Sequence, residues 1–281
     1  MGSGNKGGYY YKYAKNLAYK VSQENPNIVM QVKSTAGTNG NIRLLRQNFI
    51  NAAIAQSDVL NDAMLGLGEY KDKPTKNITV LGALYSEAIQ IVASDTSIHN
   101  IYDLAGKRVS VGEEESGVIR NAKIILGAFG LSFEDVKKEN MGFSESAAAL
   151  KEGRIDAFFC TAGYPTPAIS ELSESKGIQI ISIDSTDIAR IERMHNEFFT
   201  MTIPAGTYKN QETPAYTFGV KAVLVANKAL SESVAQKLTE AIFTFENAPS
   251  LEYATSNVPV RFHPGALRYY ESKGLKITSA K

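Results

Sequence analysis

Residues 29–62 show the clearest succession of hydrophobic and polar patterns in the chain. The segment VMQVKSTAGTNGNIRLLRQNFINAAIAQSDVLND begins with alternating apolar and polar positions and then passes through a glycine-containing corner. Helical spacing follows, and after it comes a short apolar run that leads into a second helical pattern. Alternation is typical of a half-buried strand, whereas a 3.6-residue period is typical of a helix. The pattern predicts strands at 28–33 and 52–55 and helices at 40–47 and 59–65.

The remaining chain continues the alternation of strand and helix patterns. Two strand-like runs, 78–84 and 88–93, are separated by Tyr85-Ser86-Glu87. The Ser144 position has the character of a helix N-cap. Further helices are predicted at 9–23, 118–129, 144–151, 166–172, 233–245 and 265–273, and further strands at 109–112, 155–159, 178–183, 198–203 and 216–226. Strands and helices in this order favour βαβ units, so we expect an α/β protein with a mostly parallel sheet.

The pattern restarts near residue 93, which indicates two lobes. We expect a discontinuous lobe I, formed by residues 1–88 and 215–281, and an inserted lobe II formed by residues 89–214. Hinge strands near 88–93 and 216–225 would join them. A chain of 281 residues is long enough for two such lobes.

Composition narrows the class of protein. With 30 basic and 29 acidic residues the net charge is +1, so nothing favours nucleic acid as a partner. No apolar run approaches the roughly 20 residues that span a bilayer. The single cysteine, Cys160, follows an apolar run and is expected in the core. The first eight residues contain neither a basic region nor an apolar core, so we expect a chain from which a signal peptide has been removed.

Several short motifs occur in an order that resembles a known family. They are Gly7-Gly8-Tyr9-Tyr10, Ser34-Thr35-Ala36-Gly37-Thr38, Asn41-Ile42-Arg43-Leu44-Leu45, Gln56-Ser57-Asp58, Leu104-Ala105-Gly106-Lys107-Arg108-Val109-Ser110-Val111-Gly112, Ser116-Gly117 and Ile155-Asp156-Ala157-Phe158-Phe159. The set resembles the TAXI family of TRAP-transporter solute receptors, over nearly the whole chain. Two departures are Ala36, where the family usually has a second glycine, and the acidic run Glu113-Glu114-Glu115.

The resemblance implies a two-lobed type II periplasmic-binding-protein fold with a ligand cleft between the lobes. It implies an extracytoplasmic or periplasmic receptor that delivers a small anionic solute, such as glutamate, glutamine or 2-oxoglutarate, to a TRAP-type membrane permease. We expect a monomer without a cofactor or metal. An ABC-type periplasmic binding protein for a nitrogenous or sulfonate ligand is the main alternative, and a thiol enzyme of the same fold is a weaker one.

Candidate ligand-binding residues lie at predicted strand ends and helix starts, where hydroxyls, amides and free helical N–H groups suit an anion. The candidates are Tyr10, Ser34, Thr35, Gly37, Thr38, Gln56, Ser57, Tyr85, Glu87, Ser116, Gly117 and Gly163. Ordinary helix capping is the alternative role for the Ser and Thr residues and for Asp58. Tyr85 and Glu87 are expected at a break between two strands.

Enzyme motifs are weak. The three histidines are solitary, so a zinc site is not expected. Residues 142–146, GFSES, lack the closing glycine of a nucleophile elbow. No phosphate-binding loop of the Walker type occurs. We therefore expect a protein that binds its ligand without chemical conversion.

Overall fold

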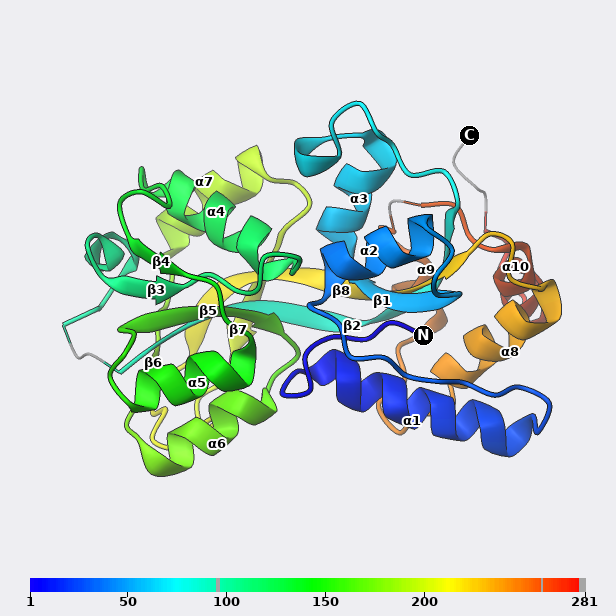
Figure 1. Ribbon diagram of the computed structural model, residues 1–281, viewed down its shortest axis with the longest axis horizontal. Helices are drawn as coiled ribbons and strands as arrows, with labels where there is room; N and C mark the ends of the chain where they lie inside the picture. Colours follow the sequence, from blue (N-terminus) through cyan, green and yellow to red (C-terminus); the bar gives the residue numbers. More distant parts are fainter. Residues whose placement is uncertain (95–96, 259, 278–281) are drawn as a thin grey trace. The chain divides into compact units, whose positions relative to one another are not determined.

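The computed structural model describes residues 1–94, 97–258 and 260–277. The chain divides into two compact units (Figure 1). Unit 1 consists of Met1–Gly4, Tyr10–Tyr85 and Lys221–Lys281, and unit 2 consists of Asn5–Tyr9 and Ser86–Val220. Two long strands, β2 (Ile78–Ala93) and β8 (Ala215–Asn227), each run from one unit into the other.

Unit 1 is built from a small sheet and surrounding helices. Strand β1 (Ala52–Gln56) pairs antiparallel with β8, with Ala52 opposite Ala226 and Gln56 opposite Ala222. The sheet order places β8 next to β2. The helices of this unit are α1 (Tyr9–Glu24), α2 (Thr38–Arg46), α3 (Ser57–Leu65), the 3-10 helix η1 (Gly68–Tyr70), α8 (Glu232–Ile242), α9 (Leu251–Thr255) and α10 (Pro264–Ser272).

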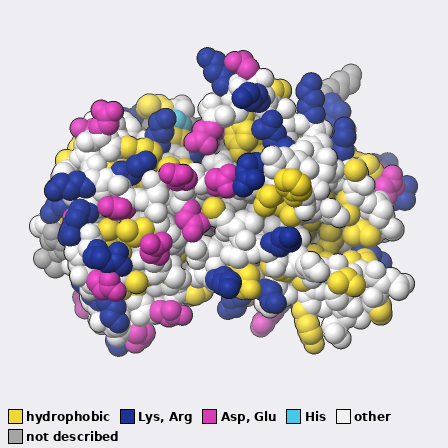
Figure 2. Space-filling model, viewed as in Figure 1, with side chains coloured by type: hydrophobic (Ala, Val, Ile, Leu, Met, Phe, Trp, Pro, Cys, Tyr) yellow, Lys and Arg dark blue, Asp and Glu magenta, His cyan; other side chains and the backbone are white. Residues whose placement is uncertain are grey.

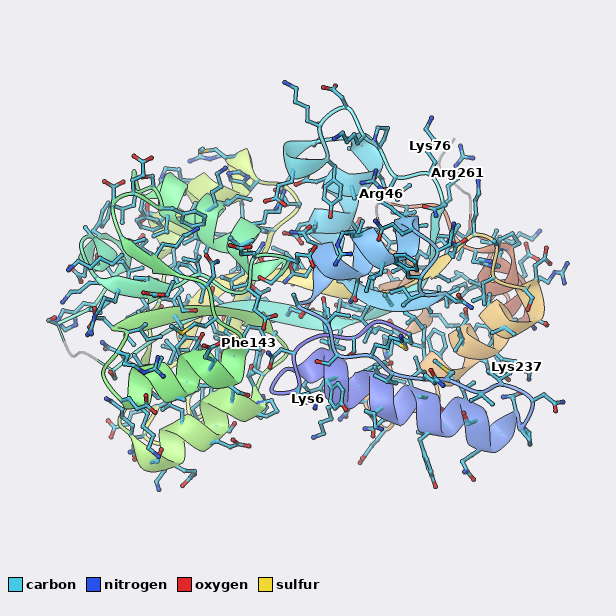
Figure 3. The ribbon with its side chains drawn as sticks, in the orientation of Figure 1. Lys6, Arg46, Lys76, Phe143, Lys237 and Arg261 are labelled. Carbon is cyan, nitrogen blue, oxygen red and sulfur yellow. The ribbon has the colours of Figure 1, made fainter. Side chains whose placement is uncertain are left out.

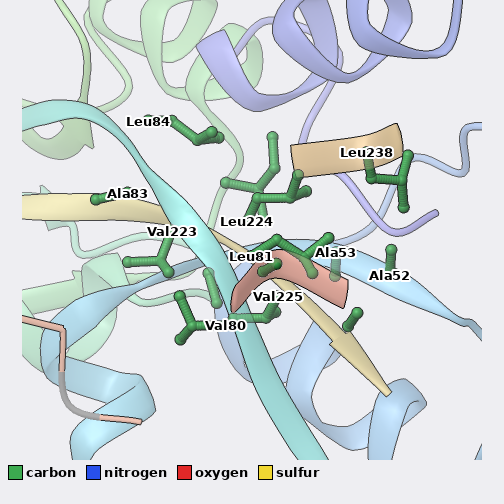
Figure 4. Close-up of a cluster of buried hydrophobic side chains, with 14 of the residues drawn as sticks. Ala52, Ala53, Val80, Leu81, Ala83, Leu84, Val223, Leu224, Val225 and Leu238 are labelled. Atoms are coloured by element: carbon green, nitrogen blue, oxygen red, sulfur yellow. The ribbon is translucent and has the colours of Figure 1, made fainter. Parts of the chain in front are cut away.

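The core of unit 1 forms around these strands (Figure 4). Every residue of β1 is buried, and Leu81 of β2 packs in the same cluster as Val223 and Leu224 of β8. Leu238 of α8 joins this cluster from the helix layer. Complete burial of a leucine or valine side chain contributes about 1.5–3 kcal/mol to folding, so this strand cluster accounts for much of the stability of unit 1.

Unit 2 contains the remaining strands, and both faces of its sheet are covered. Strand β5 (Ala157–Ala162) is buried at every position: Ala157 and Phe159 belong to one hydrophobic cluster, whereas Phe158, Cys160 and Ala162 belong to another. Alternate side chains of a strand point to opposite faces, so a continuous apolar run fits a strand covered on both sides. The other strands are β3 (Arg108–Ser110), β4 (Lys137–Glu139), β6 (Gln179–Ile180) and β7 (Phe199–Ile203).

The helices of unit 2 follow or precede these strands. They are the 3-10 helix η2 (Ile101–Leu104), α4 (Val118–Ala128), α5 (Phe143–Lys151), α6 (Pro167–Ser175) and α7 (Ser185–Met194). Strand β4 and helix α7 were not expected from the sequence. Strand β4 is exposed at all three positions, so it lacks the apolar pattern on which a strand prediction depends.

The sheet is mixed, so the prediction of a mostly parallel sheet was wrong. Strand β3 pairs in parallel with β4 and β5, but β5 pairs antiparallel with β2. Strand β8 pairs antiparallel with both β1 and β7. The antiparallel pairs all involve the two long strands that run through both units. Spacing along the sequence does not reveal the direction of such strands.

The predicted break at Tyr85-Ser86-Glu87 does not exist. Strand β2 continues through these residues for 16 positions, because none of them is a glycine or proline that would interrupt extended backbone. The predicted strand at 28–33 was also wrong in part. Only Lys33 forms a bridge, with Gly2, and residues 28–32 form no regular strand.

The short segment Asn5–Tyr9 belongs to unit 2 although residues of unit 1 flank it on both sides. Specific contacts attach this segment to the rest of unit 2. Asn5 Nδ2 donates to Glu113 Oε1 at 3.2 Å, and a Cβ atom at Gly7 would overlap the Ser144 hydroxyl. Among the described residues, no helix is both long and apolar enough to cross a membrane.

Candidate ligand-binding elements

The glycine-containing corner before α2 is held together by one buried amide. Asn41 Nδ2 donates to Ser3 O at 2.6 Å and to Ile54 O at 2.8 Å, and Asn41 Oδ1 accepts from Thr35 Oγ1 at 2.9 Å. Asn41 is fully buried and lies in the first turn of α2. Its hydrogen bonds therefore connect the corner to the end of β1. The sequence does not predict this structural role, because the partners Ser3 and Ile54 lie far from Asn41 in the chain.

Gly37 is the N-cap of α2 and has φ 123° and ψ −143°. This conformation is strained for any residue with a Cβ atom. The glycine therefore explains how the chain turns into α2 in a conformation that residues with a Cβ atom rarely adopt. No side chain forms a cap hydrogen bond at this terminus.

The hydroxyl groups of the corner are engaged within the protein. Ser34 Oγ donates to Gly4 O at 3.0 Å, and Thr35 Oγ1 lies 3.1 Å from Ser3 O. Thr38 Oγ1 accepts from the main-chain N–H of Gln56 at 3.1 Å. The capping alternative for Ser34 and Thr35 was wrong, because the N-cap is Gly37. The main-chain N–H of Gly37 is engaged as well, since it donates to Thr35 Oγ1 at 3.3 Å.

The end of β1 leads directly into α3. Gln56 is the N-cap of α3 without a side-chain cap bond, is 2% exposed, and its Oε1 has no hydrogen-bond partner among the described residues. Ser57 Oγ accepts from the N–H of Lys221 at 3.0 Å. Asp58 lies inside the helix, so the prediction that it caps α3 was wrong. A buried amide oxygen without a hydrogen-bond partner destabilises the folded state unless a ligand or water donates a hydrogen bond to it.

The tyrosines of unit 1 are mainly packing residues. Tyr10 is 8% exposed and contacts the position where a Gly4 side chain would lie. Tyr85 packs against Tyr13, with ring centroids 5.6 Å apart. Tyr13 in turn stacks on Phe245. These rings form one aromatic cluster in unit 1.

Glu87 belongs to unit 2 and is 1% exposed. Its negative charge, together with burial of the thiol, raises the pKa of Cys160; burial is the larger cause. Because Glu87 lies within β2 and is buried, the prediction that it lies at a break between two strands was wrong.

In unit 2, Ser116 and Gly117 precede α4. Gly117 is the N-cap and forms no side-chain cap bond. Ser116 Oγ donates to Glu113 O at 2.7 Å, so Ser116 does not cap the helix, contrary to the alternative prediction. Burial raises the pKa of Glu113, and the hydrogen bond from Asn5 opposes this shift. The nearby Gly112 has φ 92°, and a Cβ atom there would lie 2.7 Å from that of Val118.

The Gly163 turn of unit 2 rests on a buried polar network. Thr166 Oγ1 donates to Gly163 O at 2.9 Å and accepts from Gln90 Nε2 at 2.9 Å. Tyr208 OH accepts from the Thr166 N–H at 3.0 Å and donates to Gln90 Oε1. This network fixes a turn that contains the cis Tyr164-Pro165 bond.

The predicted Ser144 N-cap was wrong: α5 begins at Phe143 with Gly142 as its N-cap, so Ser144 lies in the first turn.

Two cavities lie in unit 1. One groove of about 270 Å³ is lined mainly by apolar side chains of the N-terminal segment and α8, including Met30, Phe49 and Leu238. A second cavity, of about 370 Å³, is lined by Arg43, Arg46 and Gln47. None of the predicted ligand-binding residues lines either one.

Among the described residues, no group of three or more His, Cys, Asp and Glu side chains could hold a metal ion. Cys160 is fully buried and its pKa is raised, which keeps the thiol protonated.

Two α/β units connected by long strands, with helix N-termini directly after the buried strand β1, define the periplasmic-binding-protein class of fold. Within that class the chain belongs to the NMT1-like family, whose model matches residues 1–274.

Three solved structures resemble the chain at low sequence identity. The alkanesulfonate-binding protein SsuA from Xanthomonas axonopodis pv. citri, bound to MOPS, has a TM-score of 0.53 at 14% identity, covering 98% of this chain and 79% of that protein. A putative L-cystine ABC transporter from Listeria monocytogenes has a TM-score of 0.52 at 16% identity, covering 86% of each chain. The aliphatic sulphonate binding protein SsuA from Escherichia coli has a TM-score of 0.50 at 16% identity, covering 85% and 71%. At these identities the similarity concerns the fold.

Proposed function

We propose that this protein is an extracytoplasmic solute-binding receptor that delivers a small anionic solute to an integral membrane permease. The observation that carries the proposal is the start of α3, where Gln56 Oε1 is buried without a hydrogen-bond partner among the described residues, at a helix N-terminus that has no side-chain cap bond. An anionic group satisfies helical N–H groups and interacts favourably with the positive end of the helix dipole. Gln56 would complete its hydrogen bonding through an N–H or O–H of the same solute.

The start of α2 supplies a second anion-binding terminus in unit 1, since Gly37 leaves its N–H groups without a side-chain cap. In unit 2 we propose the α4 terminus at Gly117 and the Gly163 turn as ligand-contacting elements. Ser116 directly precedes Gly117, and Glu87 precedes Ala88, which pairs with Ala162 next to Gly163. Tyr10, Ser34, Thr35, Thr38 and Tyr85 remain proposed site residues that act mainly by holding these termini in place.

The solute and the permease type are proposed from two different observations. The structural relatives are named as binding proteins for sulfonates and as an ABC transporter component for L-cystine, which supports an ABC-type importer and a sulfonate or amino acid as solute. The ordered motifs that resemble TAXI receptors support a TRAP permease instead, with glutamate, glutamine or 2-oxoglutarate as solute. The ABC-type receptor is the better supported of the two.

A thermal-shift screen tests receptor function and solute class together. The panel contains alkanesulfonates, amino acids and small dicarboxylates. A ligand at 100 times its dissociation constant stabilises the folded state by about 2.7 kcal/mol, which raises the melting temperature measurably. Receptor function is contradicted when no compound of the panel, at millimolar concentration, shifts the melting temperature.

Gln56→Glu tests the α3 terminus. The substitution preserves shape but places a carboxylate beside the proposed anion site, so we expect at least a tenfold loss of affinity for an anionic solute by calorimetry. Gln47→Glu is the matched control, because Gln47 is exposed at the other end of α2. Equal affinity in the two variants would place the solute elsewhere.

A further inference from the structure

The whole chain is nearly neutral, but its two units carry net charges of opposite sign. Unit 1 contains 17 Lys and Arg residues against 10 Asp and Glu, a formal net charge of +7. Unit 2 contains 13 basic residues against 19 acidic ones, a net charge of −6. Stability does not require such a separation. It creates a surface potential that selects a partner of opposite charge and accelerates association with it.

Three basic residues of unit 1 gather at the start of β2. The side chain of Asn77 donates to Arg46 O at 3.4 Å, which places Lys76 next to the end of α2. The N–H of Val80 donates to Arg261 O at 3.0 Å, which places Arg261 beside the same stretch of β2. Figure 3 shows Arg46, Lys76 and Arg261 projecting from this part of unit 1. We call these three residues the basic face.

The side chains of the basic face are available for a partner. Arg46, Lys76 and Arg261 are all exposed, and none forms an ion pair with an acidic residue in the described part of the chain. The neighbouring loop adds Lys71 and Lys73, also exposed, on either side of Asp72. In Figure 2, Lys and Arg side chains are prominent over this part of unit 1.

The shape of the basic face favours a protein surface over a lipid headgroup layer. Arg43, Arg46 and Gln47 line a cavity of about 370 Å³, which has room for the side chain of a partner. Guanidinium groups bind carboxylates in a bidentate geometry, so an Asp or Glu side chain fits this lining. Leu65 and Leu67, 63% and 49% exposed, lie in the chain just before the lysine loop and provide apolar contact area that protein interfaces use.

We propose that the basic face of unit 1 is the surface with which this receptor docks on its permease, against an acidic patch of the permease's extracytoplasmic side. This proposal rests on the proposed receptor function and adds the docking surface and the charge of the partner. Surface charges act mainly on the association rate, and the effect is screened at high ionic strength.

Binding to vesicles that contain the permease encoded beside this protein tests the proposal. Wild-type protein is compared with Arg46→Glu/Lys76→Glu and with the control Lys12→Glu/Lys15→Glu, which changes the charge of unit 1 equally through exposed residues of α1. Vesicles with about one third anionic lipid but no permease serve as the membrane probe. We expect the basic-face variant to bind permease vesicles about tenfold more weakly than both other proteins at low salt.

The results distinguish docking on the permease from an effect of overall charge, from membrane binding and from self-association. An equal loss in the α1 control shows that overall charge alone matters and overturns the docking surface, as does unchanged binding of the basic-face variant. Equal binding to empty anionic vesicles assigns the basic face to the membrane. Association with a second copy of this chain would instead appear as salt-sensitive dimerisation in sedimentation, with no vesicle requirement.

A failure of the proposed receptor function can be distinguished from a failure of the proposed docking surface. Thermal shifts by the solute panel are measured on the same three proteins, without any permease. A basic-face variant that keeps its solute response but loses vesicle binding supports the docking surface. A wild-type protein that binds permease vesicles but no solute contradicts the receptor function alone.

Discussion

The main-chain N–H of Gln56 donates to Thr38 Oγ1 at 3.1 Å, which connects the last residue of β1 to the first residue of α2. Both residues are buried. The bond holds the two uncapped helix N-termini of unit 1 in a fixed relation, because Gln56 is also the N-cap of α3.

Thr38→Val should destabilise the protein by about 1–3 kcal/mol, since the buried N–H of Gln56 loses its acceptor. Urea unfolding followed by circular dichroism measures the change. Thr38→Ser keeps the hydroxyl and should lose much less. A larger loss in Thr38→Ser than in Thr38→Val would show that the methyl group, and not the hydrogen bond, is responsible.

Gly37→Ala should lower stability by about 1–3 kcal/mol, because Gly37 has φ 123°. It should also weaken solute binding, since relaxation of the corner moves the N–H groups of α2. Gly127→Ala in α4 is the control. Nothing lies within 4 Å of a Cβ atom there and the backbone is helical, so this variant should be neutral or more stable. A neutral Gly37→Ala would contradict the strain.

Tyr208→Phe should cost about 1–3 kcal/mol, because the N–H of Thr166 and the amide of Gln90 both lose their buried partner. Tyr164→Phe removes a more exposed hydrogen bond to Thr202 O and should have a smaller effect. Thermal unfolding of the two variants gives the comparison. A larger loss for Tyr164→Phe would show that the buried network contributes little.

Asp156 should make stability depend on pH. The hydrogen bond from Arg108 lowers the pKa of this carboxyl below its usual value of 3.8. The folded state therefore binds a proton less readily than the unfolded state, and the stabilisation is present above pH 3.8 and lost as the pH falls through the lower folded pKa. The effect is modest because Arg108 is 42% exposed and solvent screens the pair.

Asp156→Asn should accordingly lower the urea midpoint at pH 7, and the difference from wild type should close as the pH approaches 2. Glu174→Gln, which removes a carboxylate from an exposed pair with Lys209, serves as control and should change the midpoint less. A difference that persists unchanged at pH 2 would rule out the ion pair as its source.

Cys160 should not react with a thiol reagent while the protein is folded, because it is fully buried and burial raises its pKa. Reaction with a chromogenic disulfide in buffer and in denaturant measures its accessibility. Stoichiometric reaction within minutes in buffer would contradict the buried setting and would reopen the thiol enzyme as a possibility.

The sequence predicted elements well where hydrophobicity was continuous. Residues of β5 are apolar on both faces, and residues 52–55 of β1 are apolar without interruption, so both strands were expected. At Tyr85-Ser86-Glu87 the sequence suggested a break because polar residues interrupted an apolar run. Extended backbone continues there because Glu87 is buried within β2, which local pattern does not reveal.

The candidate site was predictable in its location along the chain but not in its chemistry. Ser34 and Thr35 attracted attention as hydroxyl donors, yet their hydrogen bonds go to Gly4 and Ser3, about 30 positions away. Asn41 is the amide that holds the corner, and only tertiary contacts identify it. Long-range partners of this kind cannot be read from spacing.

The pairing of β1 with β8 determines when unit 1 can form during synthesis. Ala52 pairs with Ala226, so β1 leaves the ribosome long before its neighbour in the sheet exists. Unit 2, apart from Asn5–Tyr9, is continuous from Ser86 to Val220 and is complete earlier. Strand β1 and the apolar face of α1 must remain without their final sheet until the last quarter of the chain arrives, which makes the N-terminal segment the part most dependent on protection from aggregation.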